Sequence, residues 1–196
     1  MAALSPWVER WAQLVAPGAV LDLACGNGRH ARHFAALGHP VLALDRDPDA
    51  LALAAGEGIE TLRFDLEDPA LPWPLPAGHF AGIVVTNDLH RPLFAQLAAS
   101  LAPDGVLIYE TFAQGNELLG KPSNPAFLLR EGELLALAHA HGLRVIAFED
   151  GYTSVPKPAM VQRVVACKSQ LARLKAHLGP VNGPAIGGQT RDSSQE

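Results

Sequence analysis

The stretch Val20-Leu21-Asp22-Leu23-Ala24-Cys25-Gly26-Asn27-Gly28-Arg29-His30 decides the fold of this chain. A short apolar run is followed by a tight, glycine-containing turn and then at once by an alanine-rich helical pattern. This order predicts a buried parallel strand that delivers a loop to the N-terminus of a helix. Gly26 and Gly28 lack a Cβ atom, so the backbone there can adopt a left-handed turn against which a ligand can lie. Asp22 is a carboxylate in an apolar strand and needs a partner, and a positively charged ligand is one way to supply it.

The segment Asp22-Leu23-Ala24-Cys25-Gly26-Asn27-Gly28 resembles motif I of class I S-adenosylmethionine (SAM)-dependent methyltransferases, with Cys25 in place of the first glycine. The same glycines also match the fingerprint of dinucleotide-binding proteins. Asp45 lies 19 residues after Gly26, near the place of the acid that binds a ribose in such proteins. The rest of the chain has to distinguish between SAM and a dinucleotide as the ligand of this loop.

Length and composition are those of an ordinary globular protein. The chain has 196 residues, 48% hydrophobic and 18% charged, which fits one domain. The net charge of −5 argues against a general nucleic-acid surface, which needs a basic face. Cys25 and Cys167 lie too far apart in sequence to indicate a disulfide framework or a metal site. The chain shows neither a secretory signal nor an apolar run of the ~20 residues that a membrane span needs, so we expect a cytoplasmic protein without membrane contact.

Apolar runs alternate with helical patterns, which predicts an α/β, doubly wound, Rossmann-like fold. A helix is expected to start at Ser5-Pro6, and another is expected over 130–141. The proline-rich segment 69–78 cannot form the usual crossover helix, because proline lacks a backbone N–H group. The last two strands follow each other without a helical crossover, so the last one should be antiparallel. Seven strands are expected, near 20–23, 41–45, 59–64, 80–86, 106–110, 143–148 and 160–167.

One methyltransferase domain is expected over residues 1–178. Its last part, 169–178, has the pattern of a short amphipathic helix. Residues 179–196 are rich in glycine, proline and polar side chains, and we expect them to be a disordered tail.

Ligands of doubly wound sheets bind at the carboxyl ends of the strands. Asp45 can accept hydrogen bonds from two ribose hydroxyls, and Asp65 can accept one from an adenine amino group, with Leu66 against the ring. A nicotinamide cofactor needs no carboxylate at Asp22 or Asp65, so this set favours SAM, with S-adenosylhomocysteine as product. The resemblance to class I methyltransferases implies a cofactor site made of Asp22, Ala24, Cys25, Gly26, Asn27, Gly28, Asp45, Arg46, Asp65, Leu66 and Asn87.

The second half of the chain narrows the resemblance. The segments 110–116, 120–125 and 127–134 look like those of small bacterial methyltransferases of the tellurite-resistance type, and the similarity extends roughly over residues 18–168. Methyl transfer mainly needs positioning, and it needs a general base only if the acceptor is protonated. His90 and Glu110 are the candidate catalytic residues. The loop 111–125 is a candidate lid, and the candidate acceptor-contacting residues are Asp88, Asn116, Lys121 and Asn124.

The leading interpretation is therefore a class I methyltransferase that acts on a small-molecule acceptor. Neither a nucleic-acid partner nor a bound metal is expected, and the sequence gives no indication of an oligomeric state. Two alternatives stay open. One is an NAD(P)-dependent oxidoreductase, and the other is a SAM-binding protein without catalytic activity.

Overall fold

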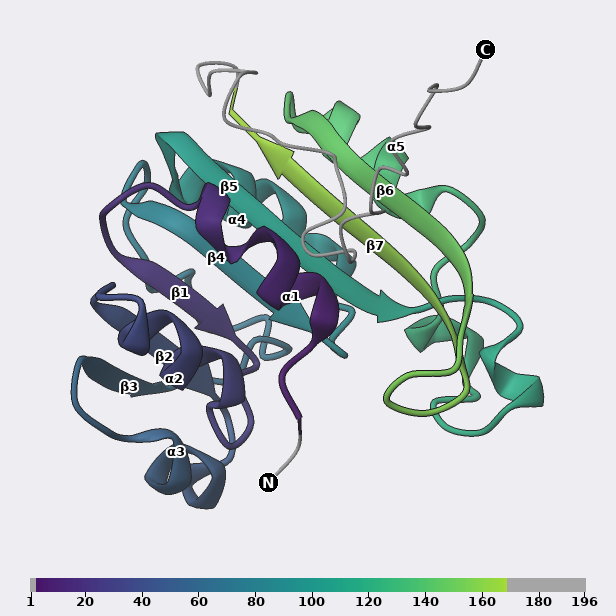
Figure 1. The fold of residues 1–196 in the computed structure, drawn as a ribbon, viewed down its shortest axis with the longest axis horizontal. Helices are drawn as coiled ribbons and strands as arrows, with labels where there is room; N and C mark the ends of the chain where they lie inside the picture. The colour runs from purple at the N-terminus through teal and green to yellow at the C-terminus, as the bar shows by residue number, and fades with distance from the viewer. Residues whose placement is uncertain (1–2, 169–196) are drawn as a thin grey trace, which may run out of the picture.

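The computed structural model describes residues 3–168 (Figure 1). Its centre is a seven-stranded sheet with the strand order β3-β2-β1-β4-β5-β7-β6. Neighbouring strands from β3 to β5 are parallel, and β7 is antiparallel to both β5 and β6. The strands are β1 (Val20–Leu23), β2 (Val41–Asp45), β3 (Ile59–Arg63), β4 (Phe80–Thr86), β5 (Leu101–Phe112), β6 (Arg144–Thr153) and β7 (Ala159–Cys167). The predicted fold class is confirmed, including the antiparallel last strand.

Helices cover both faces of the sheet, and each face has its own apolar core. The core that includes Trp7, Phe34 and Leu51 lies between the sheet and the helices α1 to α3. The core that includes Phe94, Leu97 and Leu134 lies on the other face, under α4 and α5. The α-helices are α1 (Pro6–Trp11), α2 (Arg29–Ala36), α3 (Pro48–Ala54), α4 (Phe94–Ser100) and α5 (Glu133–Ala140). The short 3-10 helices are η1 (Ala12–Leu14), η2 (Arg91–Leu93), η3 (Asn116–Leu118) and η4 (Pro125–Phe127).

The first helix begins where the sequence predicts it. The Ser5 hydroxyl accepts hydrogen bonds from the backbone N–H groups of Trp7 and Val8, and Pro6 occupies the first helical turn. Trp7 and Trp11 are buried and pack edge to face with their ring centroids 5.7 Å apart. This packing holds α1 across the sheet (Figure 1), so the residues before α1 lie at the carboxyl ends of the strands.

The segment between β3 and β4 contains no helix, as its prolines predict. Trp73 and Leu75 of this segment pack against the core under α4, and the Trp73 indole N–H donates to the Ser100 hydroxyl at 3.0 Å. The extended chain therefore covers the face that a crossover helix would otherwise cover.

The bounds of three elements differ from the prediction. β5 begins at Leu101 rather than near residue 106, because Leu101 pairs with Phe80 before the register shifts. The helix expected over 130–141 is shorter, with Gly132 as N-cap residue at a φ of 63°. The closing hairpin is longer than predicted, because backbone pairing continues to Thr153 opposite Ala159. The predicted amphipathic helix and tail lie outside the described residues. Within residues 3–168, no helix is long and apolar enough to cross a bilayer.

Candidate functional site

Backbone strain marks the ends of two neighbouring strands. In residues 3–168, Ala24 and Asn87 are the non-glycine residues with a positive φ, at 51° and 59°. Ala24 directly follows β1, and Asn87 directly follows β4, which is the next strand in the sheet. A left-handed conformation costs an L-residue roughly 1–2 kcal/mol. Strain gathered at one place in a fold points to a functional site.

The two glycines of the first loop serve different purposes. A Cβ atom at Gly28 would lie 2.6 Å from the Ala54 Cβ, so Gly28 is required by the packing of α2 against α3. A Cβ atom at Gly26 would meet no protein atom within 4 Å, which leaves space for a ligand above the loop. The Gly26 N–H donates to the Asp45 carboxylate at 2.8 Å and thereby ties the loop to the end of β2.

A small cleft of about 110 Å³ lies beside Asp45. It contains five of the predicted cofactor residues, together with Phe64, Glu67 and Asp88, which were not predicted there. Each of Asp45 and Asp65 accepts one hydrogen bond from the backbone N–H two residues later, at 3.0 Å, which orients its carboxylate. Carboxylate oxygens have further acceptor sites, so both side chains can still bind hydroxyl or amino groups. The residues that line the cleft are Ala24, Asp45, Arg46, Phe64, Asp65, Leu66, Glu67 and Asp88.

Two adjacent residues after β4 line different spaces from those that the sequence predicts for them. Asn87, predicted to bind the cofactor, lines a second and larger cavity. Asp88, predicted to contact the acceptor, lines the small cleft, where burial and the nearby Glu67 raise the pKa of its carboxyl group. The Tyr109 hydroxyl donates to the Asp88 carbonyl oxygen at 3.0 Å and fixes this loop. Asn87 forms a bend with a φ of 59° directly after β4, so the chain turns there and the two adjacent side chains face different spaces.

The buried acid of β1 has a partner within the protein. One Asp22 carboxylate oxygen accepts a hydrogen bond from the Ala31 N–H at 2.8 Å, in the first turn of α2. The side chain is 1% exposed, and burial raises its pKa to about 7. Asp22 therefore binds the helix that follows the loop. Its predicted contact with a ligand ammonium group stays a prediction.

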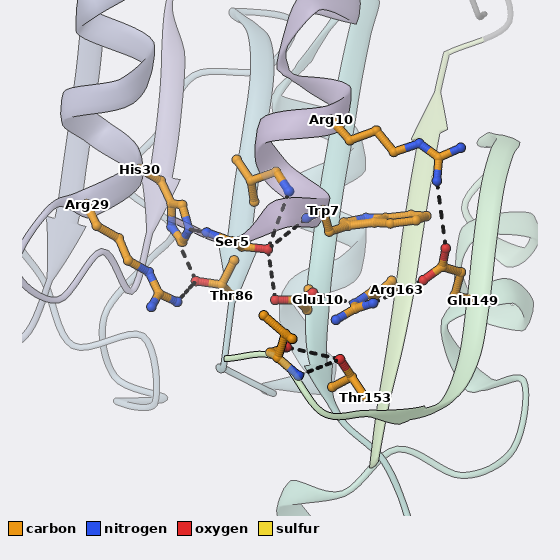
Figure 2. Close-up of polar contacts among 12 residues, drawn as sticks. Ser5, Trp7, Arg10, Arg29, His30, Thr86, Glu110, Glu149, Thr153 and Arg163 are labelled. Atoms are coloured by element: carbon orange, nitrogen blue, oxygen red, sulfur yellow. Dashed lines mark hydrogen bonds and ion pairs between the residues drawn. The ribbon is translucent and has the colours of Figure 1, made fainter. Parts of the chain in front are cut away.

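Ser5 connects the start of α1 to both sides of the site (Figure 2). Its backbone N–H donates to His30 Nε2 at 3.4 Å, and its hydroxyl donates to a Glu110 carboxylate oxygen at 3.0 Å. Burial and the charge of Arg29 lower the pKa of His30 to about 3, so the ring is neutral. Because Nε2 accepts, Nδ1 carries the proton and points to the Thr86 hydroxyl at 3.4 Å.

The larger cavity has a volume of about 690 Å³ and lies at the ends of β4 and β5. It brings together four of the predicted site residues, Asn87, Glu110, Lys121 and Asn124. The Glu110 carboxylate forms an ion pair with Arg163, which in turn contacts Glu149 at 3.0 Å. The other lining residues come from segments far apart in sequence, and Phe112, Pro122 and Ser123 among them belong to the predicted lid loop. They are Ala3, Leu4, Ser5, Arg29, Phe112, Pro122, Ser123, Phe127, Thr153, Val155, Pro156, Lys157, Ala159, Val161 and Arg163.

One unpredicted residue left a signal in the sequence. Arg163 is a charged residue within the apolar run of β7, and such a residue requires a partner. The lining residues of the N-terminal arm (residues 3–5) and of the hairpin between β6 and β7 have no local sequence signal, since only the tertiary fold brings them to the cavity.

Several predicted site residues lie elsewhere. His90 lines neither cavity and is the N-cap residue of η2. Asn116 is 2% exposed and holds the loop together, since its amide group donates to the Pro122 carbonyl and accepts from the Met160 N–H. Cys25 is buried, and burial raises the pKa of its thiol to about 12. The side chains of Cys25 and Asn27 line neither the cleft nor the cavity. Within residues 3–168, no group of His, Cys, Asp and Glu side chains is arranged to hold a metal ion.

Residues 20–105 match the family model of the methyltransferase domain. No curated protein sequence matches the chain. Among solved structures, TehB from Haemophilus influenzae is similar with a TM-score of 0.69 and 16% identity, over 86% of this chain and 63% of that chain. A SAM-dependent methyltransferase from Mesorhizobium loti has a TM-score of 0.68 and 19% identity, over 83% of this chain and 96% of that chain.

A third similar structure is the 1,6-didemethyltoxoflavin-N1-methyltransferase of Burkholderia thailandensis, described with bound substrate and S-adenosylhomocysteine. Its TM-score is 0.60 at 23% identity, over 83% of this chain and 76% of that chain. The class I methyltransferase fold is confirmed. The match over residues 20–105 to a methyltransferase domain agrees with the prediction of a methyltransferase, and SAM as its cofactor is taken up as a proposal below. The similarity to TehB is one of fold.

Proposed function

We propose that this protein, which has the class I SAM-dependent methyltransferase fold, transfers the methyl group of SAM to a small molecule bound in the larger cavity. The observation that carries this proposal is that two adjacent residues at the end of β4 line the two cavities. Asn87 lines one and its neighbour Asp88 lines the other, so ligands in the two spaces would meet at the end of β4.

The residues of the small cleft suit the nucleoside part of SAM. Asp45 would bind the ribose hydroxyls, and Asp65 and Leu66 would bind the adenine ring. At about 110 Å³ the cleft is smaller than the roughly 300–1,000 Å³ of most ligand pockets, so it would hold only part of the cofactor. The remainder would extend over Gly26, where the loop leaves open space. Bound SAM supplies a methyl group activated by the positive charge of its sulfur.

Methyl transfer breaks the bond between the methyl carbon and the sulfonium sulfur while a bond to the acceptor atom forms. The sulfur keeps the electron pair, and S-adenosylhomocysteine leaves. The protein would act by holding the two reactants in line. Glu110 is a poor candidate for a general base, because its carboxylate already binds Arg163 and the Ser5 hydroxyl. His90 does not line the cavity.

Titration calorimetry of the full chain with SAM, S-adenosylhomocysteine and NADH tests the cofactor. We expect the first two to bind and NADH not to bind. Asp65→Asn should weaken SAM binding at least tenfold, whereas Asp49→Asn, an exposed acid outside the cleft, should leave it unchanged. Binding of NADH in place of SAM would favour the oxidoreductase. SAM binding without formation of S-adenosylhomocysteine with any acceptor would favour a non-catalytic protein. The single domain over 1–178 and the cytoplasmic location stay predictions.

A further inference from the structure

The walls of the larger cavity carry an excess of positive charge. Four basic side chains line it, Arg29, Lys121, Lys157 and Arg163. Among the described residues that line the cavity, Glu110 is the single acid, and its charge is compensated by Arg163. Lys121 and Lys157 are exposed on the 121–124 loop and on the β6–β7 hairpin, so they face the cavity from two separate segments. This arrangement favours an anionic group on the ligand.

The same cavity has a largely apolar wall. Leu4, Phe112 and Val161 contribute apolar surface, and two large apolar side chains are left open to solvent there, Phe127 at 46% and Val155 at 58% exposure. Exposed apolar side chains that gather in a concave site indicate a ligand with an apolar body. The Lys157 ammonium lies 5.7 Å from the centroid of the Phe112 ring, so the charged and apolar surfaces adjoin.

The cavity also lacks a group that would deprotonate an acceptor. Within residues 3–168, no histidine lines it, and its one carboxylate is held by Arg163 and Ser5. A general base is unnecessary when the acceptor is already ionised at neutral pH. An anionic acceptor satisfies this condition, whereas a protonated amine does not.

We propose that the larger cavity binds a small organic anion with an apolar body, with the negative charge near Lys121 and Lys157 and the body against Phe112, Phe127 and Val155. This inference rests on the proposed function. It narrows the acceptor class, because the volume of about 690 Å³ and the apolar wall do not suit an inorganic oxyanion alone.

Calorimetry on the full chain saturated with S-adenosylhomocysteine tests the inference with defined probes. The anions are 4-phenylbutyrate, 2-naphthoate and decanoate, their primary amides are the neutral analogues, and acetate is an anion without an apolar body. We expect at least one of the three anions to bind ten times more tightly than its amide and than acetate. The double variant Lys121→Gln/Lys157→Gln should reduce this preference to less than threefold. Arg144→Gln, an exposed cation that does not line the cavity, is the matched control and should keep it.

The inference is wrong if the amides bind as tightly as the anions, or if none of the three anions binds while S-adenosylhomocysteine does. It is also wrong if the double variant keeps the full preference. Absence of S-adenosylhomocysteine binding would instead overturn the proposed function, and this inference with it. The two failures are therefore distinguishable in the same experiment.

Discussion

The two cavities are built in different ways. The small cleft takes its lining from the carboxyl ends of β1, β2, β3 and β4 and the residues that follow them, within residues 24–88. The larger cavity takes its lining from the N-terminal arm, the ends of β4 and β5, the 121–127 loop and the closing hairpin. The match to the methyltransferase family covers residues 20–105, so it includes the whole cleft but ends before most of the cavity. The part of the chain that matches the methyltransferase domain and most of the lining of the larger cavity thus lie in separate parts of one sheet.

The largest expected effect concerns two buried ionisable groups beneath the cofactor loop, Asp22 and His30. The pKa of Asp22 is raised to about 7, so its contribution to stability is present below pH 4 and is lost as the pH rises to 7. The pKa of His30 is lowered to about 3, so its contribution is present above pH 6.5 and is lost as the pH falls to 3. Between pH 4 and 6.5 the two contributions oppose each other.

Asp22→Asn and His30→Gln should therefore change the pH dependence of the unfolding free energy in opposite directions. Relative to the parent chain, Asp22→Asn should lose about 3 kcal/mol as the pH falls from 6.5 to 4. His30→Gln should lose about 3 kcal/mol as the pH rises over the same range. Urea unfolding at several pH values measures both. If the unfolding free energies of both variants changed with pH in the same direction relative to the parent chain, the opposite contributions of Asp22 and His30 would be contradicted.

The second prediction separates the two glycines of the cofactor loop. Gly28→Ala should destabilise the protein by about 3 kcal/mol, because its Cβ would overlap Ala54 and its φ is positive. Gly26→Ala should cost only about 1 kcal/mol, for its positive φ, but should weaken SAM binding at least tenfold. Urea unfolding and calorimetry together distinguish packing from binding. Equal losses of stability in both variants would contradict the assigned roles.

The third prediction concerns the acceptor side. Arg163→Met should leave the nearly buried Glu110 without its cation and should destabilise the protein by about 2 kcal/mol, measured by urea unfolding. The double variant Arg163→Met/Glu110→Gln should recover part of this loss, since no charge remains at the nearly buried position 110, while Glu149 is about half exposed. Calorimetry should find SAM affinity within threefold of the parent chain in both variants. A tenfold loss of SAM affinity would show that the two cavities are energetically coupled.

The smallest expected effect concerns the arm before α1. Ser5→Ala removes the helix cap and the hydrogen bond to Glu110, and it should cost about 1 kcal/mol in urea unfolding. Ser5→Asp restores a capping group but brings a carboxylate next to Glu110, so it should be no more stable than Ser5→Ala. If Ser5→Asp recovers full stability, the contact with Glu110 contributes little.

The sequence predicts the cleft far better than the cavity. Ala24, Asp45, Arg46, Asp65 and Leu66 occupy fixed places after strands that can be recognised from apolar runs, so their convergence follows from the sheet order. Phe127 and Val155 reach the cavity only through the path of the 121–127 loop and the length of the β6–β7 hairpin, and no local sequence pattern predicts either of these. Asn116 is predicted to contact the acceptor because it is a polar residue in a polar loop. Its side chain instead forms hydrogen bonds that stabilise the loop itself. His90 is predicted to contact the acceptor because it follows the fourth strand, but at that place it is the N-cap residue of η2 and lines neither cavity.

The alternation of Asn87 and Asp88 has a consequence for how such a protein can diverge. Under the proposed function, point substitutions at Asn87 would alter the acceptor side and leave the cofactor side intact, so acceptor preference could change without loss of cofactor binding. Insertion or deletion of one residue after Thr86 would instead displace the left-handed bend at Asn87 and disturb the lining of both cavities at once. Natural relatives that change their acceptor should therefore vary in residue type at this point and keep the number of residues constant.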